Sequence, residues 1–237
     1  MGVKGLIIED YSVTLHAKQG KLNIYTDMDR LQTQFAAKLL EVKAIKLQPQ
    51  DPFTWASGWK SPFYCDNRKT LSFPALRSYV KTELTRLIME EFPEAEAVAG
   101  VATGAIAQGA LVADALGLPF AYVRSKPKDH GLENLIEGEL APGAKVIVVE
   151  DLISTGGSSL KAVEALRKAG MEVIGMVASY TYGFPIAEKA FSDAGVRLVT
   201  LTNYEAVLEV AKQIGYITED QIPTLNDWRR DPANWNK

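Results

Sequence analysis

The segment that follows the most apolar run of the sequence combines carboxylates, hydroxyls and glycines. Val146-Ile147-Val148-Val149 is followed by Glu150-Asp151-Leu152-Ile153-Ser154-Thr155-Gly156-Gly157-Ser158-Ser159. The apolar run predicts a buried strand, and the glycine-rich turn predicts the start of a helix. Backbone N–H groups at a helix N-terminus bind anions, so the turn suits a phosphate monoester. Carboxylates accept hydrogen bonds from vicinal hydroxyls. A ribose 5-phosphate unit meets both demands.

Two other phosphate-binding motifs do not fit this segment. No Lys follows the second glycine, which excludes the Walker-type loop, and no G-x-G-x-x-G follows a predicted strand. A dinucleotide site is therefore not expected. The simpler alternative is an acidic strand end followed by an ordinary helix cap.

A second segment concentrates positive charge in an acidic protein. Arg124, Lys126, Lys128 and His130 fall within seven positions. The chain from there to Pro142 has no helical or strand period, which gives a loop of about 16 residues, longer than most connections in compact domains. A cationic lid would stabilise the charge that grows on a diphosphate leaving group and would exclude water. A solvated charged loop is the alternative.

A third segment carries aromatic side chains on both sides of a turn. Phe53-Thr54-Trp55-Ala56 and Trp59-Lys60-Ser61-Pro62-Phe63-Tyr64 flank Ser57-Gly58. This pattern predicts a β-hairpin, with Pro62 favouring an edge position for the second arm. Aromatic faces suit a flat ring, although the same side chains can equally pack the hairpin onto the core.

The elements that position these segments alternate regularly. Helices that stop at glycine follow short apolar strands: we expect strands over 97–101, 119–124, 145–150, 172–178 and 197–201, and helices over 106–116, 158–169, 186–194 and 204–214. This alternation is typical of a parallel sheet covered on both faces, in which ligands bind beyond the carboxyl ends of the strands. Two earlier helices are expected, one through Leu31, Phe35, Leu39 and Val42 and one over 72–92. The turn at 100–106 offers backbone N–H groups to a diphosphate.

Composition narrows the class of protein further. The chain has 237 residues, 47% of them apolar, with 26 basic and 29 acidic residues and a net charge of −3. This composition excludes a wholly disordered or coiled-coil chain and disfavours bulk nucleic acid as a partner. The lone Cys65 permits no intrachain disulfide, which fits a cytoplasmic protein. No membrane span is expected. Residues 1–28 show no clear period and are interpreted as an extension.

Three of these motifs resemble one family. Residues 150–158 resemble the 5-phosphoribosyl-1-diphosphate (PRPP) motif of type I phosphoribosyltransferases, and Lys128-Asp129-His130-Gly131 resembles the catalytic loop of orotate phosphoribosyltransferases. Residues 53–68 resemble the hood segment of the same enzymes. The resemblance covers about residues 30–215 and implies an α/β fold, with a parallel β-sheet flanked by helices and a small N-terminal hood. The expected domain spans 29–237, with the hood at about 44–70.

The resemblance also implies an activity and a set of site residues. The activity is transfer of 5-phosphoribosyl from PRPP to orotate in pyrimidine biosynthesis, with Mg²⁺ carried by PRPP and a lid shared between the subunits of a homodimer. The catalytic residues would be Lys128, His130 and Asp151. PRPP would contact Arg124, Lys128, His130, Glu150, Asp151, Leu152, Ile153, Ser154, Thr155, Gly156, Gly157 and Ser158. Orotate would contact Ser154, with Arg68 and Lys60 as candidates to pair with its carboxylate.

The chain departs from the family pattern at several cationic positions. Many orotate enzymes carry Lys where Ala56 and Ser125 stand, and near Gly104, and an Asp-Arg pair where this chain has Thr181-Tyr182. Two other functions stay open: a purine or uracil phosphoribosyltransferase, and a regulator that kept the PRPP site but binds nucleic acid.

Overall fold

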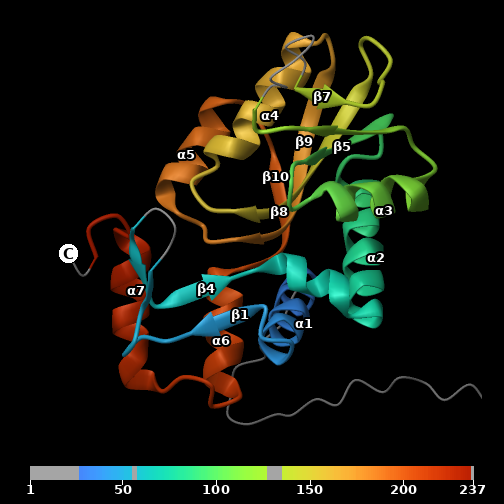
Figure 1. Cartoon of the computed structure of the whole chain (residues 1–237). Coiled ribbons are helices and arrows are strands. Elements are labelled where there is room, and N and C mark those ends of the chain that lie inside the picture. The colour runs from blue at the N-terminus through green and yellow to red at the C-terminus, as the bar shows by residue number, and fades with distance from the viewer. Residues whose placement is uncertain (1–26, 55–57, 127–134, 236–237) are drawn as a thin grey trace, which may run out of the picture.

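A computed structural model of the protein describes residues 27–54, 58–126 and 135–235. Most of the described chain forms a sheet with helices on both faces (Figure 1). On one face lie α1 (Asp27–Glu41), α2 (Pro74–Glu91), α3 (Ile106–Leu116) and α6 (Tyr204–Gln213), and on the other lie α4 (Gly157–Lys168) and α5 (Pro185–Asp193). No helix in the described ranges is both long and apolar enough to cross a bilayer. The predicted layered α/β class is confirmed.

The central sheet has the strand order β10-β9-β8-β5-β6-β7. Five strands run parallel to one another: β5 (Ala97–Val101), β6 (Phe120–Val123), β8 (Lys145–Ile153), β9 (Glu172–Thr181) and β10 (Leu198–Asn203). Their carboxyl ends therefore share one edge of the sheet, where ligands bind in such folds.

Two details of the sheet differ from the prediction. The short strand β7 (Ile136–Glu137) pairs antiparallel with β6, within a segment predicted to lack regular structure. A run of two residues is too short to show a period. In addition, β8 and β9 do not end at the predicted Glu150 and Ala178 but continue side by side to Ile153 and Thr181. The two carboxylates thus belong to the strand itself.

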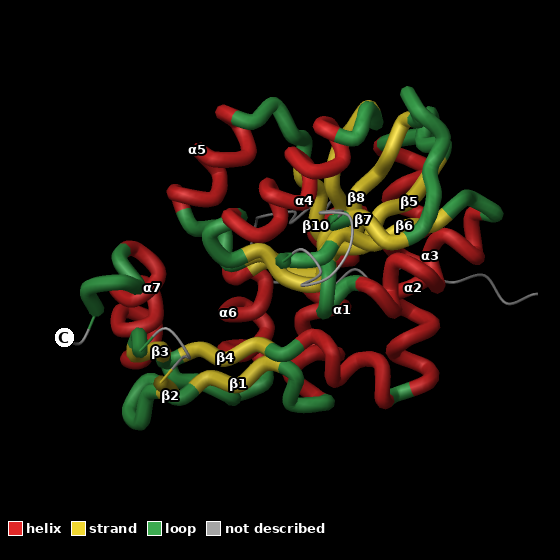
Figure 2. Tube along the Cα trace, turned by 45° about the horizontal axis from the view of Figure 1, so that its top comes forward, coloured by secondary structure: helices red, strands yellow, loops and turns green. Residues whose placement is uncertain are grey.

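In its described residues, the segment predicted to form the hood, about 44–70, contains two small antiparallel strand pairs and the start of a 3₁₀ helix. β1 (Ile45–Leu47) pairs with β4 (Phe63–Cys65), and β2 (Phe53–Thr54) pairs with β3 (Lys60–Ser61), which confirms the predicted hairpin (Figure 2). The 3₁₀ helix η1 (Asn67–Ser72) then leads into α2. Residues 55–57, which include Trp55 and Ala56, lie outside the described residues.

A C-terminal helix that the sequence pattern did not indicate closes this side of the molecule. After η2 (Glu219–Gln221), α7 (Ile222–Arg230) packs beside the hood. Its Trp228 is fully buried, and its ring is parallel to that of Phe63, with centroids 6.1 Å apart. On another side Phe63 stacks on Tyr180 of β9 at 5.8 Å. Aromatic contacts therefore join the hood, the sheet and α7.

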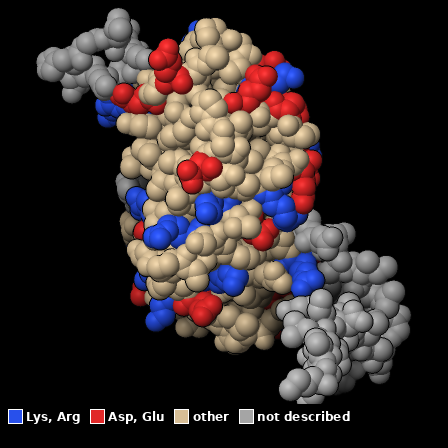
Figure 3. Space-filling model, turned by 90° about the vertical axis from the view of Figure 1, so that its right-hand side faces the viewer, with Lys and Arg blue, Asp and Glu red and all other residues tan. Residues whose placement is uncertain are grey.

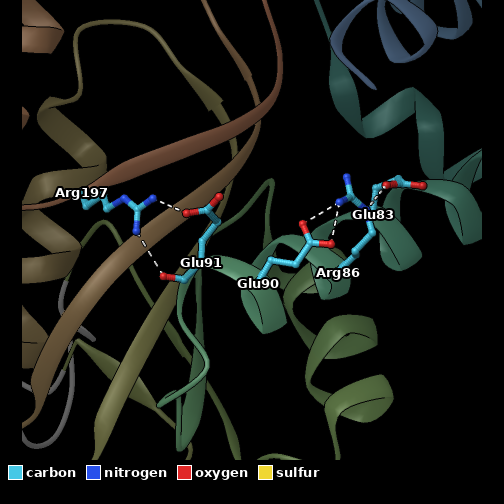
Figure 4. Close-up of polar contacts among 5 residues, drawn as sticks. All are labelled: Glu83, Arg86, Glu90, Glu91 and Arg197. Carbon is cyan, nitrogen blue, oxygen red and sulfur yellow. Dashed lines mark hydrogen bonds and ion pairs between the residues drawn. The ribbon is translucent and has the colours of Figure 1, made fainter. Parts of the chain in front are cut away.

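The far end of α2 is fixed to the sheet by an arginine. Arg197, which precedes β10, donates to the backbone oxygen of Glu91 at 3.2 Å and pairs with its carboxylate (Figure 4). Its guanidinium also lies over the ring of Phe92, 5.3 Å from the centroid. Arg86 bridges Glu83 and Glu90 on the exposed side of the same helix. The Arg197 contacts hold the end of α2 at the edge of the sheet remote from the carboxyl ends of the strands, while the Arg86 pairs lie within the helix.

Charge is mixed on the face beside α2 and α3. There, Lys and Arg side chains form a band across the middle of the surface, with Asp and Glu on either side (Figure 3). An extended basic surface, which a nucleic-acid-binding regulator would need, is not seen in that view.

Candidate active site

The loop after β8 has the geometry of an anion site. Gly156 precedes the first turn of α4 with φ +80°, and a Cβ there would come 2.9 Å from the Phe191 ring, so only glycine fits without strain. Thr155, Gly157 and Ser158 are exposed. Their backbone N–H groups and hydroxyls are accessible at the N-terminus of a twelve-residue helix.

The other predicted residues of this segment contribute differently. Ser154 is half-buried at the start of the loop. Ile153 is fully buried in the core on the α4 side of the sheet, and Leu152 packs against the core on the opposite side. These two side chains therefore fix the strand end, and only their backbone is suited to contact a ligand.

The two carboxylates occupy different environments. Glu150 is 4% exposed, and its Oε2 accepts a hydrogen bond from Ser159 Oγ at 2.8 Å while its Oε1 accepts one from the Asp151 N–H at 3.0 Å. Burial, followed by the nearby negative charge of Asp151, raises the pKa of Glu150 well above its usual value of 4.5. Asp151 is half-buried and its side chain lies beside the turn after β5. Asp151 is therefore the better placed of the two to meet a ligand hydroxyl.

The turn after β5 approaches Asp151 closely. A Cβ on Gly104 would come 2.6 Å from Asp151 Oδ1 and closer still to Oδ2. The turn is held by Ala102 N–H donating to the Val123 oxygen at 2.8 Å and by Ala105 N–H donating to the Val101 oxygen at 3.1 Å. Small residues at 102–105 thus bring the backbone of this turn next to the carboxylate.

A buried asparagine from the hood holds the same strand. Asn67 Nδ2 donates to the backbone oxygen of Asp151 at 2.6 Å, and Asn67 Oδ1 lies 3.4 Å from the Cys65 sulfur, which donates to it. Sequence reasoning missed Asn67 because nothing in its spacing distinguishes it from a loop asparagine. It connects the hood directly to the predicted ribose-binding strand.

The cationic residues predicted for the site differ in their contacts and exposure. Arg124 is half-buried at the end of β6 and contacts Glu137 at 3.5 Å. The exposed side chain of Arg68 forms an ion pair with Asp66 at 2.7 Å. Asp66, and to a lesser extent Asp151, raises the pKa of the Arg68 guanidinium. Lys60 donates to Thr54 at 2.9 Å within the hairpin. Lys128 and His130 lie outside the described residues, so their roles stay predictions.

A cavity of about 320 Å³ lies between the strand ends and α4. Its lining brings together Ala102, Arg124 and Ser158 from three segments that the sequence singled out. Lys161 and Lys168, one and three turns into α4, also line it, together with Glu164. Sequence reasoning missed both lysines, which add positive charge along the α4 side of this cavity, with Lys161 nearer than Lys168 to the proposed phosphate loop.

The end of β9 receives a cation from a distant part of the chain. Arg229 of α7 donates to the backbone oxygens of Tyr182 and Gly183, both at 2.9 Å, and pairs with Glu205 at 2.6 Å. Gly183 has φ +60°, and a Cβ there would come 2.7 Å from Arg229 Nη2. The strand end that lacks the Asp-Arg pair of many orotate enzymes is thus held by Arg229.

Comparisons with known proteins agree with this fold. A family model described as phosphoribosyl transferase domain matches residues 80–212. The orotate phosphoribosyltransferase of Bacteroides fragilis is 76% identical over 208 residues, which cover 88% of this chain and 98% of the relative. That of Streptococcus thermophilus is 54% identical over 205 residues, or 86% and 98% of the two chains.

Solved structures give the same result. The orotate phosphoribosyltransferase of Aeropyrum pernix superposes with a TM-score of 0.68 at 29% identity, over 78% of this chain and 99% of that one. The Mycobacterium tuberculosis orotate phosphoribosyltransferase in complex with PRPP superposes with a TM-score of 0.57 at 25% identity, over 76% of this chain and 98% of that one. The fold and the matched domain define a phosphoribosyltransferase of type I. At this level of identity and coverage, the chain belongs to the orotate phosphoribosyltransferase family.

Proposed function

We propose that this chain transfers the 5-phosphoribosyl group of PRPP to orotate, giving orotidine 5′-monophosphate and diphosphate in pyrimidine biosynthesis. The observations that carry the proposal are that the strand with Asp151 runs into the glycine-rich loop at the start of α4, and that the Asp151 carboxylate lies against the turn at Gly104. A ribose 5-phosphate that carries a diphosphate needs a hydroxyl acceptor between two anion sites. The names of the highly similar relatives support orotate as the acceptor base.

Each part of the site would hold one part of the substrate. The loop at Thr155–Ser158 would bind the 5-phosphate through backbone N–H groups and hydroxyls. Asp151 would accept hydrogen bonds from the ribose hydroxyls, and Arg124 would lie near the diphosphate. Catalysis would then rest on orientation and on stabilising the charge of the leaving group, with no covalent nucleophile.

Magnesium fits this site as an ion carried by the substrate. Mg²⁺ bound through phosphates takes few direct protein ligands. Within the described ranges, no three or more His, Cys, Asp and Glu side chains gather into a possible metal site. An ion held by PRPP oxygens would neutralise the charge of the diphosphate. The residues beside it would be Asp151 and the backbone of the 102–105 turn.

The remaining parts of the proposal concern the lid, the assembly and the compartment. We expect Lys128 and His130 to approach the diphosphate from a lid shared across a homodimer. The lone Cys65 and the pathway favour the cytoplasm.

The direct test is the loss of orotate ultraviolet absorbance when PRPP and Mg²⁺ are added to the full chain. We expect the loss to require both additions, and uracil, adenine and hypoxanthine to be poor acceptors. Turnover of one of those bases in preference to orotate would overturn the proposal.

Two variants test the site assignment within this assay. Lys128→Ala should lower the rate by orders of magnitude with the fold intact, because a cation at the leaving group is lost. Asp151→Asn should raise KM for PRPP, because a charged acceptor is replaced by a neutral amide. Near-normal kinetics of both variants would remove the assignment.

A further inference from the structure

Ser159 and Glu150 form a buried polar pair beneath the proposed PRPP site. Ser159 is the third residue of α4 and 1% exposed, and Glu150 belongs to β8 and is 4% exposed. The hydroxyl donates to Glu150 Oε2 at 2.8 Å. A hydrogen bond between a hydroxyl and a carboxylate out of contact with water is among the stronger ones in a protein.

The same carboxylate also fixes the backbone of its neighbour. Glu150 Oε1 accepts the N–H of Asp151 at 3.0 Å, while Asn67 donates to the oxygen of Asp151 at 2.6 Å. Asp151 is therefore held on both sides of its backbone, and its side chain is left to face the turn at Gly104. Glu150 thus connects the strand that carries Asp151 to the first turn of α4.

On the strands that flank Glu150, the residues paired with it and with Val149 are uncharged and do not compete for these hydrogen bonds. Its β9 partner is Ala178, and on β5 Gly100 pairs with the adjacent Val149. The charge facing Glu150 is that of Asp151 on its own strand. Ser159 on α4 is the side-chain donor that favours the ionised carboxylate.

We propose that Ser159 is a positioning residue that acts through Glu150, setting Asp151 and the phosphate loop in the arrangement that binds PRPP. This inference rests on the proposed function. Without the hydroxyl, Glu150 loses one of its two internal donors, and the connection between β8 and α4 is released. The ground-state affinity for PRPP should suffer more than the chemical step, because no group at the leaving diphosphate changes.

The test is a double-variant cycle on the full-length chain, read out as KM for each substrate and kcat. We expect Ser159→Ala to raise KM for PRPP by about tenfold, which corresponds to the loss of about one buried hydrogen bond. KM for orotate should stay within about twofold, the range of independent sites. In a Glu150→Ala background, Ser159→Ala should have no further effect on KM for PRPP. Ser192→Ala, on the exposed side of α5, is the matched control and should behave as the parent.

Three outcomes would overturn the inference. These are an unchanged KM for PRPP in Ser159→Ala, an equal rise in KM for orotate, or the same fold-change in both backgrounds. If Ser159→Ala or the double variant does not fold, Ser159→Cys replaces it, and KM for PRPP and KM for orotate are compared with those of the parent. A thiol is similar in shape to a hydroxyl but is a poor hydrogen-bond donor. A parent chain that converts orotate while Ser159→Ala matches it would reject this inference and leave the proposed function intact. A parent chain without activity would reject the function.

Discussion

Gly104→Ala should disable PRPP binding while leaving the fold intact. The added Cβ would come 2.6 Å from Asp151 Oδ1 and closer to Oδ2, whereas ordinary contact begins at 3.4 Å. The Asp151 carboxylate must therefore move by about 1 Å, and a misplacement of that size costs about 100-fold in rate. The carboxylate is half-buried and has room to turn toward solvent, so the cost should fall on binding and not on stability.

The assay is kcat/KM for PRPP at saturating orotate, beside a thermal melt. Gly143→Ala is the control, because Gly143 has φ +77°, has no atom within 4 Å of an added Cβ, and precedes the amino end of β8. Strain there should lower stability by about 1 kcal/mol and leave KM unchanged. The reasoning is refuted if Gly104→Ala keeps parental kcat/KM, or if its loss of activity merely follows a loss of stability as large as that of Gly143→Ala.

Three further variants test the surrounding contacts. Because burial raises the pKa of Glu150 above 4.5, the folded chain holds a proton that the unfolded chain releases, and stability falls as pH rises from 4.5 through the folded pKa. The free energy of unfolding of Glu150→Gln should therefore rise relative to the parent as pH rises, by about 1.4 kcal/mol for each pH unit by which the folded pKa exceeds 4.5. Denaturant unfolding at pH 4.5 and pH 8 measures this difference, and a difference that does not grow with pH contradicts the prediction. Arg229→Met should cost about 2 kcal/mol in the same unfolding assay, since it removes the bonds to the Tyr182 and Gly183 oxygens; a parental value would show that α7 is held by its aromatic contacts alone. Asn67→Ala should raise KM for PRPP about tenfold, since the Asp151 oxygen loses a buried donor; a rise in KM for orotate only would contradict this.

The sequence predicted the sheet and the position of the glycine-rich loop well because both depend on local patterns. Apolar runs between glycine-stopped helices placed the five parallel strands within a few residues, and the spacing of Gly156 and Ser158 placed the loop at the start of α4. The end of β8 was set too early, at Glu150. The two acids interrupt the apolar run, but Glu150 is buried with internal donors and the strand continues.

The contacts that the sequence did not reveal join residues far apart in the chain. Asn67 reaches Asp151 across 84 positions, and Arg229 reaches Tyr182 across 47. Neither residue lies in a periodic or glycine-marked segment. The helix that carries Arg229 also follows the matched domain, so no motif marked it. Such pairs depend on the tertiary fold and become visible only when the elements are assembled.

Calorimetric titration of PRPP with Mg²⁺ into the full chain tests most directly whether the end of β8 is a sugar-phosphate site. The account predicts one saturable site per chain, with binding that weakens in Asp151→Asn and in Gly104→Ala. No detectable affinity in the parent chain, or affinity that both variants leave unchanged, would contradict it.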